Sequence, residues 1–102
     1  MKLDTNELYN DPEVKEYLER YQDLWSVMEE AYSVIEEIFG MGARVTFEVV
    51  HDTEIENYDQ LFGYIDTEYS PEESYRLLQV FDDRWYTDKI DLIGERLNFM
   101  VR

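Results

Sequence analysis

The chain has no cysteine, which removes several classes of protein at once. It can have no disulfide framework, no thiolate zinc site and no cysteine nucleophile. Because disulfides belong to oxidising compartments, we expect a cytoplasmic protein. No apolar run approaches the roughly 20 residues of a membrane span, and the N-terminal residues lack the order of a secretion signal, so no membrane association is expected.

Basic residues are few. Nine lysines and arginines stand against 25 acidic residues, which gives a formal charge of −16 and a pI of about 4.1. This charge repels phosphate groups, so direct binding to nucleic acid is not expected. It would accelerate the encounter with a basic protein partner. The alternative is that the acidic surface only keeps the protein in solution.

The 102 residues suit one domain with one core. We expect a polar N-terminal arm over residues 1–10 and a single domain over residues 11–102. The strongest pattern is an amphipathic helix between the start signal Asp11-Pro12 and the stop signal Gly40. Its apolar face recurs at steps of four and three, at Val14, Leu18, Tyr21, Trp25, Met28, Tyr32, Ile35 and Phe39.

A continuous helix of roughly 28 residues would be about 42 Å long, which exceeds the roughly 30 Å width of a compact domain of this size. Three interpretations stay open. The helix lies on its own domain with a frayed start, or it breaks near residues 22–26, or its tyrosine-rich first half packs on a second copy or another partner.

Alternating apolar residues predict three strands over residues 44–52, 60–67 and 95–102. Ser70-Pro71 opens a second, shorter helix, and residues 87–94 are expected to form a loop. The predicted fold is α+β, in the order α-β-β-α-β. Both helices lie on one face of a three-stranded mixed sheet of order 2-1-3. The other face would carry Thr46, Glu48, Val50, Phe62, Tyr64, Asn98 and Met100, a set too apolar for a purely solvated surface.

The middle of the chain resembles a group of small acidic proteins common in cyanobacteria and scattered through other bacteria. The resemblance rests on residues 45–86, with an Asp-x-Glu-Ile turn, a QLFGYI strand, a proline-opened helix and the run Asp82-Asp83-Arg84-Trp85. Thr53 stands where the group commonly has a proline. Because the group is uncharacterised, the resemblance implies a small bacterial accessory protein, antitoxin-like in its sharpest form, and assigns no catalytic or binding residue.

Catalytic motifs are missing, and we expect no enzyme, no cofactor and no metal site. His51 with Asp52, Glu54 and Glu56 has the donor types of a divalent-metal site, but there is no second histidine and no calcium-loop spacing. Asp82 and Asp83 could serve acid–base chemistry, although neighbouring helical residues point about 100° apart. We interpret them instead as a solvated acidic helix end that pairs with Arg84.

Aromatic residues are numerous: nine tyrosines, five phenylalanines and two tryptophans. Tyrosine and tryptophan anchor many interfaces, and tyrosines among carboxylates suit a lysine- and arginine-rich partner. The alternative is that the tyrosines form only the rim of the core. The predicted interface residues are Tyr17, Tyr21, Leu24, Trp25, Phe62, Tyr64, Asp82, Asp83, Trp85 and Tyr86.

These observations predict a non-enzymatic, acidic protein-binding module that associates with or neutralises a basic protein. Two alternatives are a homodimeric accessory protein and an inhibitor whose carboxylates mimic phosphate groups toward a nucleic-acid-binding enzyme. A metal-dependent hydrolase acting at Asp82, Asp83 or His51 is a further, less favoured alternative.

Overall fold

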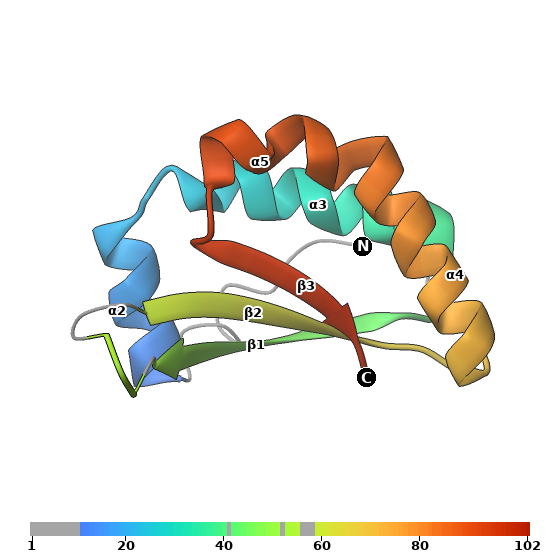
Figure 1. Cartoon of the computed structure of the whole chain (residues 1–102), viewed down its shortest axis with the longest axis horizontal. Coiled ribbons are helices and arrows are strands. Elements are labelled where there is room, and N and C mark those ends of the chain that lie inside the picture. Colours follow the sequence, from blue (N-terminus) through green and yellow to red (C-terminus); the bar gives the residue numbers. More distant parts are fainter. Residues whose placement is uncertain (1–10, 41, 52, 56–58) are drawn as a thin grey trace.

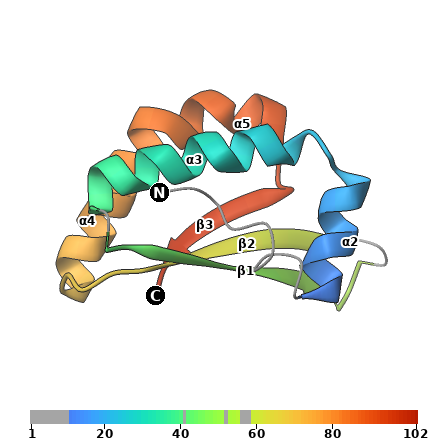
Figure 2. The ribbon, with the colours of Figure 1, turned by 180° about the vertical axis from the view of Figure 1, so that it is seen from behind.

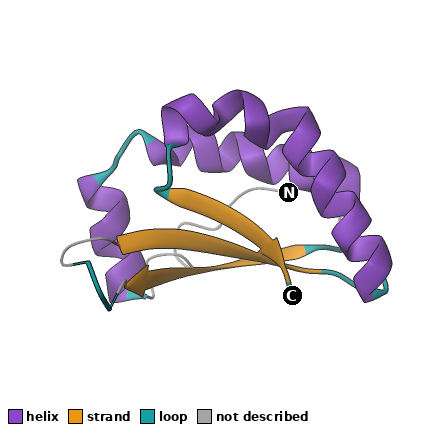
Figure 3. Ribbon diagram, viewed as in Figure 1, coloured by secondary structure: helices purple, strands orange, loops and turns teal. Residues whose placement is uncertain are grey.

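The computed structural model describes residues 11–40, 42–51, 53–55 and 59–102 (Figures 1 and 3). The predicted arm at residues 1–10 lies outside them. The elements are, in chain order, α2 (Pro12–Arg20), α3 (Leu24–Phe39), β1 (Arg44–His51), β2 (Asp59–Asp66), α4 (Pro71–Phe81), the π-helical turn η1 (Asp82–Tyr86), α5 (Thr87–Ile93) and β3 (Leu97–Val101).

The predicted long helix is divided into α2 and α3. Asp11 caps α2 by accepting hydrogen bonds from the backbone amides of Glu13 and Val14 at 3.0 and 3.4 Å. The helix ends at Arg20, and Tyr21 leaves helical geometry with φ −120° and ψ 68°. A single continuous helix is therefore wrong, whereas the alternative of a break near residues 22–26 is confirmed, with the break at residues 21–23. It turns α2 down over the end of the sheet, where Val14 and Leu18 are buried (Figures 1 and 2).

The described residues form one sheet in the order β1-β2-β3. β1 pairs antiparallel with β2, and β3 pairs parallel with β2. The predicted order 2-1-3 is wrong, because the crossover from β2 through α4, η1 and α5 returns to the side of β2 that is not paired with β1. Gly63 of β2 stands between Phe47 and Phe99 in register, so the central strand carries its smallest residue where both neighbours carry phenylalanine.

The second helical segment is longer than predicted. Ser70 caps α4 by accepting a hydrogen bond from the amide of Glu73 at 3.2 Å, as expected from the Ser-Pro start. The helix continues through η1 into α5, so the loop prediction for residues 87–94 is wrong. Gly94, with φ +62°, ends α5. Threonine, lysine and two aspartates in this stretch hide the helical pattern, since Ile93 is the buried residue of α5.

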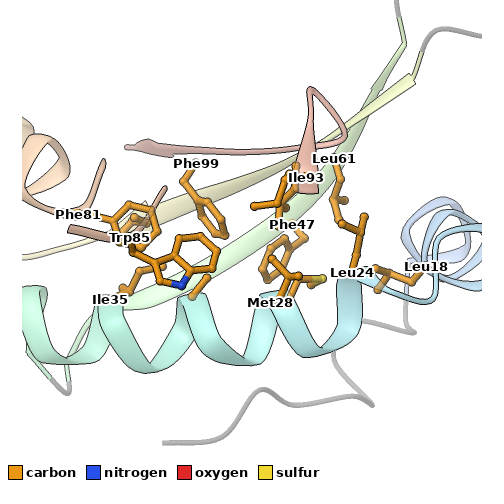
Figure 4. Packing of buried hydrophobic residues seen from close by; sticks show 14 of the residues in the cluster. Leu18, Leu24, Met28, Ile35, Phe47, Leu61, Phe81, Trp85, Ile93 and Phe99 are labelled. Atoms are coloured by element: carbon orange, nitrogen blue, oxygen red, sulfur yellow. The ribbon is translucent and has the colours of Figure 1, made fainter. Parts of the chain in front are cut away.

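The hydrophobic core lies between the helices and one face of the sheet (Figure 4). Helix α3 contributes Leu24, Met28 and Ile35, while Phe81 and Trp85 stack with their ring centroids 5.4 Å apart. This distance and the burial of both rings are typical of aromatic stacking, which stabilises the core in addition to the hydrophobic effect. The predicted α+β class with a three-stranded mixed sheet is confirmed.

Helices α3, α4 and α5 lie on one side of the sheet, and no described helix lies on the other (Figures 1 and 2). The open side carries the even-numbered positions of the three strands, because the odd-numbered side chains Phe47, Leu61 and Phe99 are buried beneath the helices. None of the described helices has both the length and the apolar character required to cross a lipid bilayer.

Candidate protein-binding surfaces

Three ion pairs join α3 to the C-terminal helical segment. Their members are Asp23 with Arg96 (2.9 Å), Glu30 with Lys89 (2.9 Å) and Glu37 with Arg84 (2.5 Å). The residue numbers of the acidic partners increase while those of the basic partners decrease, so the two segments run antiparallel. The prediction that Arg84 pairs with Asp82 or Asp83 is wrong, because its guanidinium contacts Glu37 instead.

We call these three ion pairs the seam, and hydrogen bonds hold each of its carboxylates. Glu30 accepts hydrogen bonds from Lys89 and, at 2.7 Å, from the indole nitrogen of Trp85; these contacts, the Lys89 bond foremost, lower its pKa. The two bonds from Arg96 to Asp23 lower the pKa of that carboxyl as well. Arg96 also donates to the backbone oxygens of Leu92 and Ile93 at the end of α5. It thereby ties the helix break to the start of β3.

The seam leaves an unequal distribution of charge on the outer side of α4, η1 and α5. The basic residues of this segment are all paired, since Arg76 also contacts Glu73. Within the described chain, six carboxylates of the segment and its end have no side-chain hydrogen bond or ion pair. We call them the acidic helical surface: Glu72, Asp82, Asp83, Asp88, Asp91 and Glu95.

Apolar side chains are exposed on the same helical segment. Tyr75 is 61% exposed, Leu92 57% and Ile90 41%. Exposed apolar groups between unpaired carboxylates are what an interface with a basic, amphipathic partner requires, because the former provide buried area and the latter complementary charge. The sequence identified Asp82 and Asp83 as interface residues here. It did not identify Ile90 and Leu92, because residues 87–94 were expected to form a loop, and Tyr75 was not among the predicted interface residues.

Asp82 and Tyr86 lie together in η1, beside β3. Burial, with a smaller effect of Asp83, raises the pKa of Asp82; burial and then Asp82 raise the pKa of Tyr86. The Tyr86 hydroxyl donates to the backbone oxygen of Leu97 at 2.7 Å. The sequence predicted that Asp82 and Asp83 stand at a helix end. This is wrong, because η1 continues into α5.

A second candidate surface is the outer sheet face, formed by Arg44, Thr46, Glu48, Val50, Gln60, Phe62, Tyr64, Asp66, Asn98, Met100 and Arg102. At its centre the rings of Phe62 and Tyr64 stack with centroids 6.1 Å apart. Arg102 lies over the Tyr64 ring at 5.0 Å and pairs with Asp66 at 3.3 Å. This face holds two of the predicted interface residues, Phe62 and Tyr64, in half-buried positions.

Other predicted interface residues lie inside the molecule. Tyr17, Leu24 and Trp85 are buried in the core, with 2%, 0% and 5% of their surface exposed, so they offer little area to a partner. Tyr17 donates its hydroxyl proton to the backbone oxygen of Arg96 at 2.7 Å, and burial raises its pKa to about 12. Tyr21 and Trp25 are half-buried against the core, where Tyr21 lies beneath the guanidinium of Arg96 at 5.2 Å.

His51 lies between two carboxylates that sequence reasoning did not associate with it. Its Nδ1 is 2.7 Å from Asp59, and its Nε2 contacts Glu13 of α2. Of its predicted neighbours, Glu54 is exposed, and Asp52 and Glu56 fall outside the described residues. The described part of the chain contains no group of side chains suited to a metal ion.

A comparison with known proteins matches no protein-family model, no curated protein and no solved structure. The resemblance to small acidic bacterial proteins therefore stays a prediction.

Proposed function

We propose that this chain is a non-enzymatic protein-binding module that holds a basic protein against its acidic helical surface. In the sharpest form of the proposal it neutralises that partner, as an antitoxin does. One observation carries the proposal. The three basic residues of α4, η1 and α5 are held in ion pairs, two of them with carboxylates of α3 and one with a carboxylate of α4 itself. Six carboxylates of the same segment and its end have no such pair within the described chain.

The charges of the paired arginines and lysine are already balanced by their own carboxylates, so they do not cancel the negative charge of the acidic helical surface. A formal charge of −16 speeds the approach of a basic protein, and the local excess on one segment would orient it. The exposed Tyr75, Ile90 and Leu92 would then add apolar contacts at short range. Tyrosine among carboxylates also suits lysine and arginine side chains through cation–π contacts.

The test is capture of a partner from the native host with a tagged chain at low salt, followed by a wash at about 0.5 M salt, where exposed charges are strongly screened. We expect one basic protein that is retained at low salt and released at high salt. The triple variant Asp83→Lys, Asp88→Lys and Asp91→Lys should lose it.

The matched control reverses the same number of exposed carboxylates elsewhere, in Glu19→Lys, Glu29→Lys and Glu68→Lys. Both triple variants change the net charge equally, so a specific surface predicts loss of binding in the first alone. Equal loss in both would indicate a nonspecific charge effect, and recovery of the tagged chain alone would contradict the proposal.

A further inference from the structure

We propose that the outer sheet face is a self-association surface, on which a second copy of this chain packs face to face. The helices cover only one side of the sheet, so this side is open among the described elements (Figures 1 and 2). Its centre is apolar and partly exposed: Phe62 and Tyr64 are half-buried, and Met100 is 46% exposed. A three-stranded sheet face with an apolar centre can pack on another sheet, face to face.

The charges of this face identify a second copy as its occupant. In a chain with 25 acidic and nine basic residues, the face carries two arginines and two carboxylates. Arg102 and Asp66 form an ion pair, which leaves Arg44 and Glu48. The face is therefore neutral overall. A basic partner would find no excess of negative charge here, whereas two copies can approach through their neutral faces with the least mutual repulsion.

Arg44 is exceptional among the described basic residues, because no hydrogen bond or ion pair within the described chain engages its guanidinium. An arginine without a carboxylate partner is unexpected in so acidic a molecule. Glu48, on the same strand four residues later, has no ion pair with any described residue, although its charge contributes to the raised pKa of Arg102. One unpaired cation and one unpaired anion on a single face are self-complementary under two-fold symmetry.

The strand register gives the rows of side chains that would meet in such a dimer. Thr46, Tyr64 and Met100 form one row across the sheet, and Glu48, Phe62 and Asn98 form the next. A two-fold axis across the strands, between these rows, places Tyr64 of each copy over Phe62 of the other. The same axis places Arg44 of each copy over Val50 of the other, one row along the strand from Glu48. A long arginine side chain can reach the carboxylate in the neighbouring row, so that the pair forms twice.

The size of the face sets the strength of the dimer. Strands lie about 4.8 Å apart and rise about 3.3 Å per residue, so the face is smaller than the roughly 800 Å² that each partner contributes to a standard stable interface. We therefore expect a weak dimer whose mass depends on concentration between about 1 µM and 1 mM.

The test is sedimentation velocity on the full chain. Arg44→Glu and Glu48→Arg should each weaken the dimer about tenfold, because each breaks two exposed ion pairs and creates two like-charge contacts. The double variant should return to within about threefold of the parent chain, since it restores both pairs in reverse. Phe62→Lys should give a monomer, and Tyr75→Lys, on α4, is its matched control.

The response to salt distinguishes the dimer from the binding of a basic partner. Raising salt from about 0.05 M to about 0.5 M should strengthen the dimer, because it screens repulsion between acidic copies, but it should release a basic partner. The dimer proposal is overturned if the chain is a monomer throughout this range, or if the charge-swapped double variant is as weak as the single ones. Neither result affects capture of a basic protein at the acidic helical surface.

Discussion

Gly63 lies in the middle of the central strand, between two phenylalanine rings. A Cβ at this position would meet ring carbons of Phe99 at 2.8 Å and of Phe47 at 3.0 Å. The absence of a side chain therefore lets both rings enter the core from the outer strands. Glycine is required here because the two rings approach the backbone closely, and not because the position has a positive φ.

We predict that Gly63→Ala lowers the free energy of unfolding by about 1–3 kcal/mol, because the extra methyl group overpacks a filled core. Chemical denaturation measures the change. Gly42→Ala is the control, since a Cβ there would meet nothing within 4 Å. An equal loss in the two variants would mean that the effect comes from the glycine backbone and not from the rings.

His51 illustrates a residue whose role depends on its partners. Both ring nitrogens face carboxylate oxygens, an arrangement that favours the charged ring, because only that form has an N–H donor for each carboxylate. The hydrogen bond with Glu13, followed by that with Asp59, raises the pKa of His51 above its ordinary value of 6.5.

Because the pKa is raised in the folded state, its stabilising effect is complete below the unfolded value and is lost as pH rises through the folded value. We predict that His51→Gln lowers the unfolding temperature most between about pH 5 and pH 6.5, where the carboxylates are ionised, and least under alkaline conditions. Thermal unfolding across pH measures this gap.

An NMR titration of the His51 ring provides the control. Glu13→Gln should lower its midpoint while the contact with Asp59 is kept. A gap in unfolding temperature that is constant across pH would show that His51 acts by packing alone.

At the scale of elements, the break between α2 and α3 decides the shape of the helical layer. The turn is closed by a hydrogen bond from the amide of Leu24 to the oxygen of Tyr21 at 3.0 Å. Asp23 has φ −62° and ψ −22°. Gln22 thus occupies the second position of a β-turn, where proline is favoured.

We predict that Gln22→Pro changes the free energy of unfolding by less than about 1 kcal/mol, whereas Glu29→Pro, inside α3, costs about 3 kcal/mol or more. Chemical denaturation of both variants measures the difference. A continuous helix would be damaged at both sites, so similar losses would contradict the break.

At the scale of the whole molecule, unbalanced acidity opposes folding. Ion pairs engage Arg20, Arg76, Arg84, Lys89, Arg96 and Arg102, yet the chain keeps a formal charge of −16. Exposed pairs contribute little to stability, so repulsion among the remaining carboxylates should dominate the response to salt.

We predict that the unfolding temperature rises as salt is increased to about 0.5 M, because screening weakens this repulsion. Differential scanning calorimetry at low protein concentration measures the rise. The variant Asp83→Asn with Asp91→Asn carries less charge and should show a smaller rise. A fall with salt would instead assign net stability to the ion pairs.

The amino-acid sequence by itself determined the local features of this protein. Alternation in the strands separates the core residue Phe47 from the open-face residue Glu48, and the Asp11-Pro12 and Ser70-Pro71 signals start α2 and α4. These features follow from neighbouring residues alone, because side-chain direction and capping depend on short spacings. The spacing of seven between Asp23, Glu30 and Glu37 was a further signal for the seam, although it names no partner.

Only the tertiary structure decided how the segments meet. The position of β3 beside β2 depends on where the crossover returns, and the helix break depends on what α2 can cover once the chain folds. The contacts of His51 with Glu13 and of Asp23 with Arg96 join residues 38 and 73 positions apart. Periodicity shows which side of a segment is apolar, but it does not show which other segment covers that side.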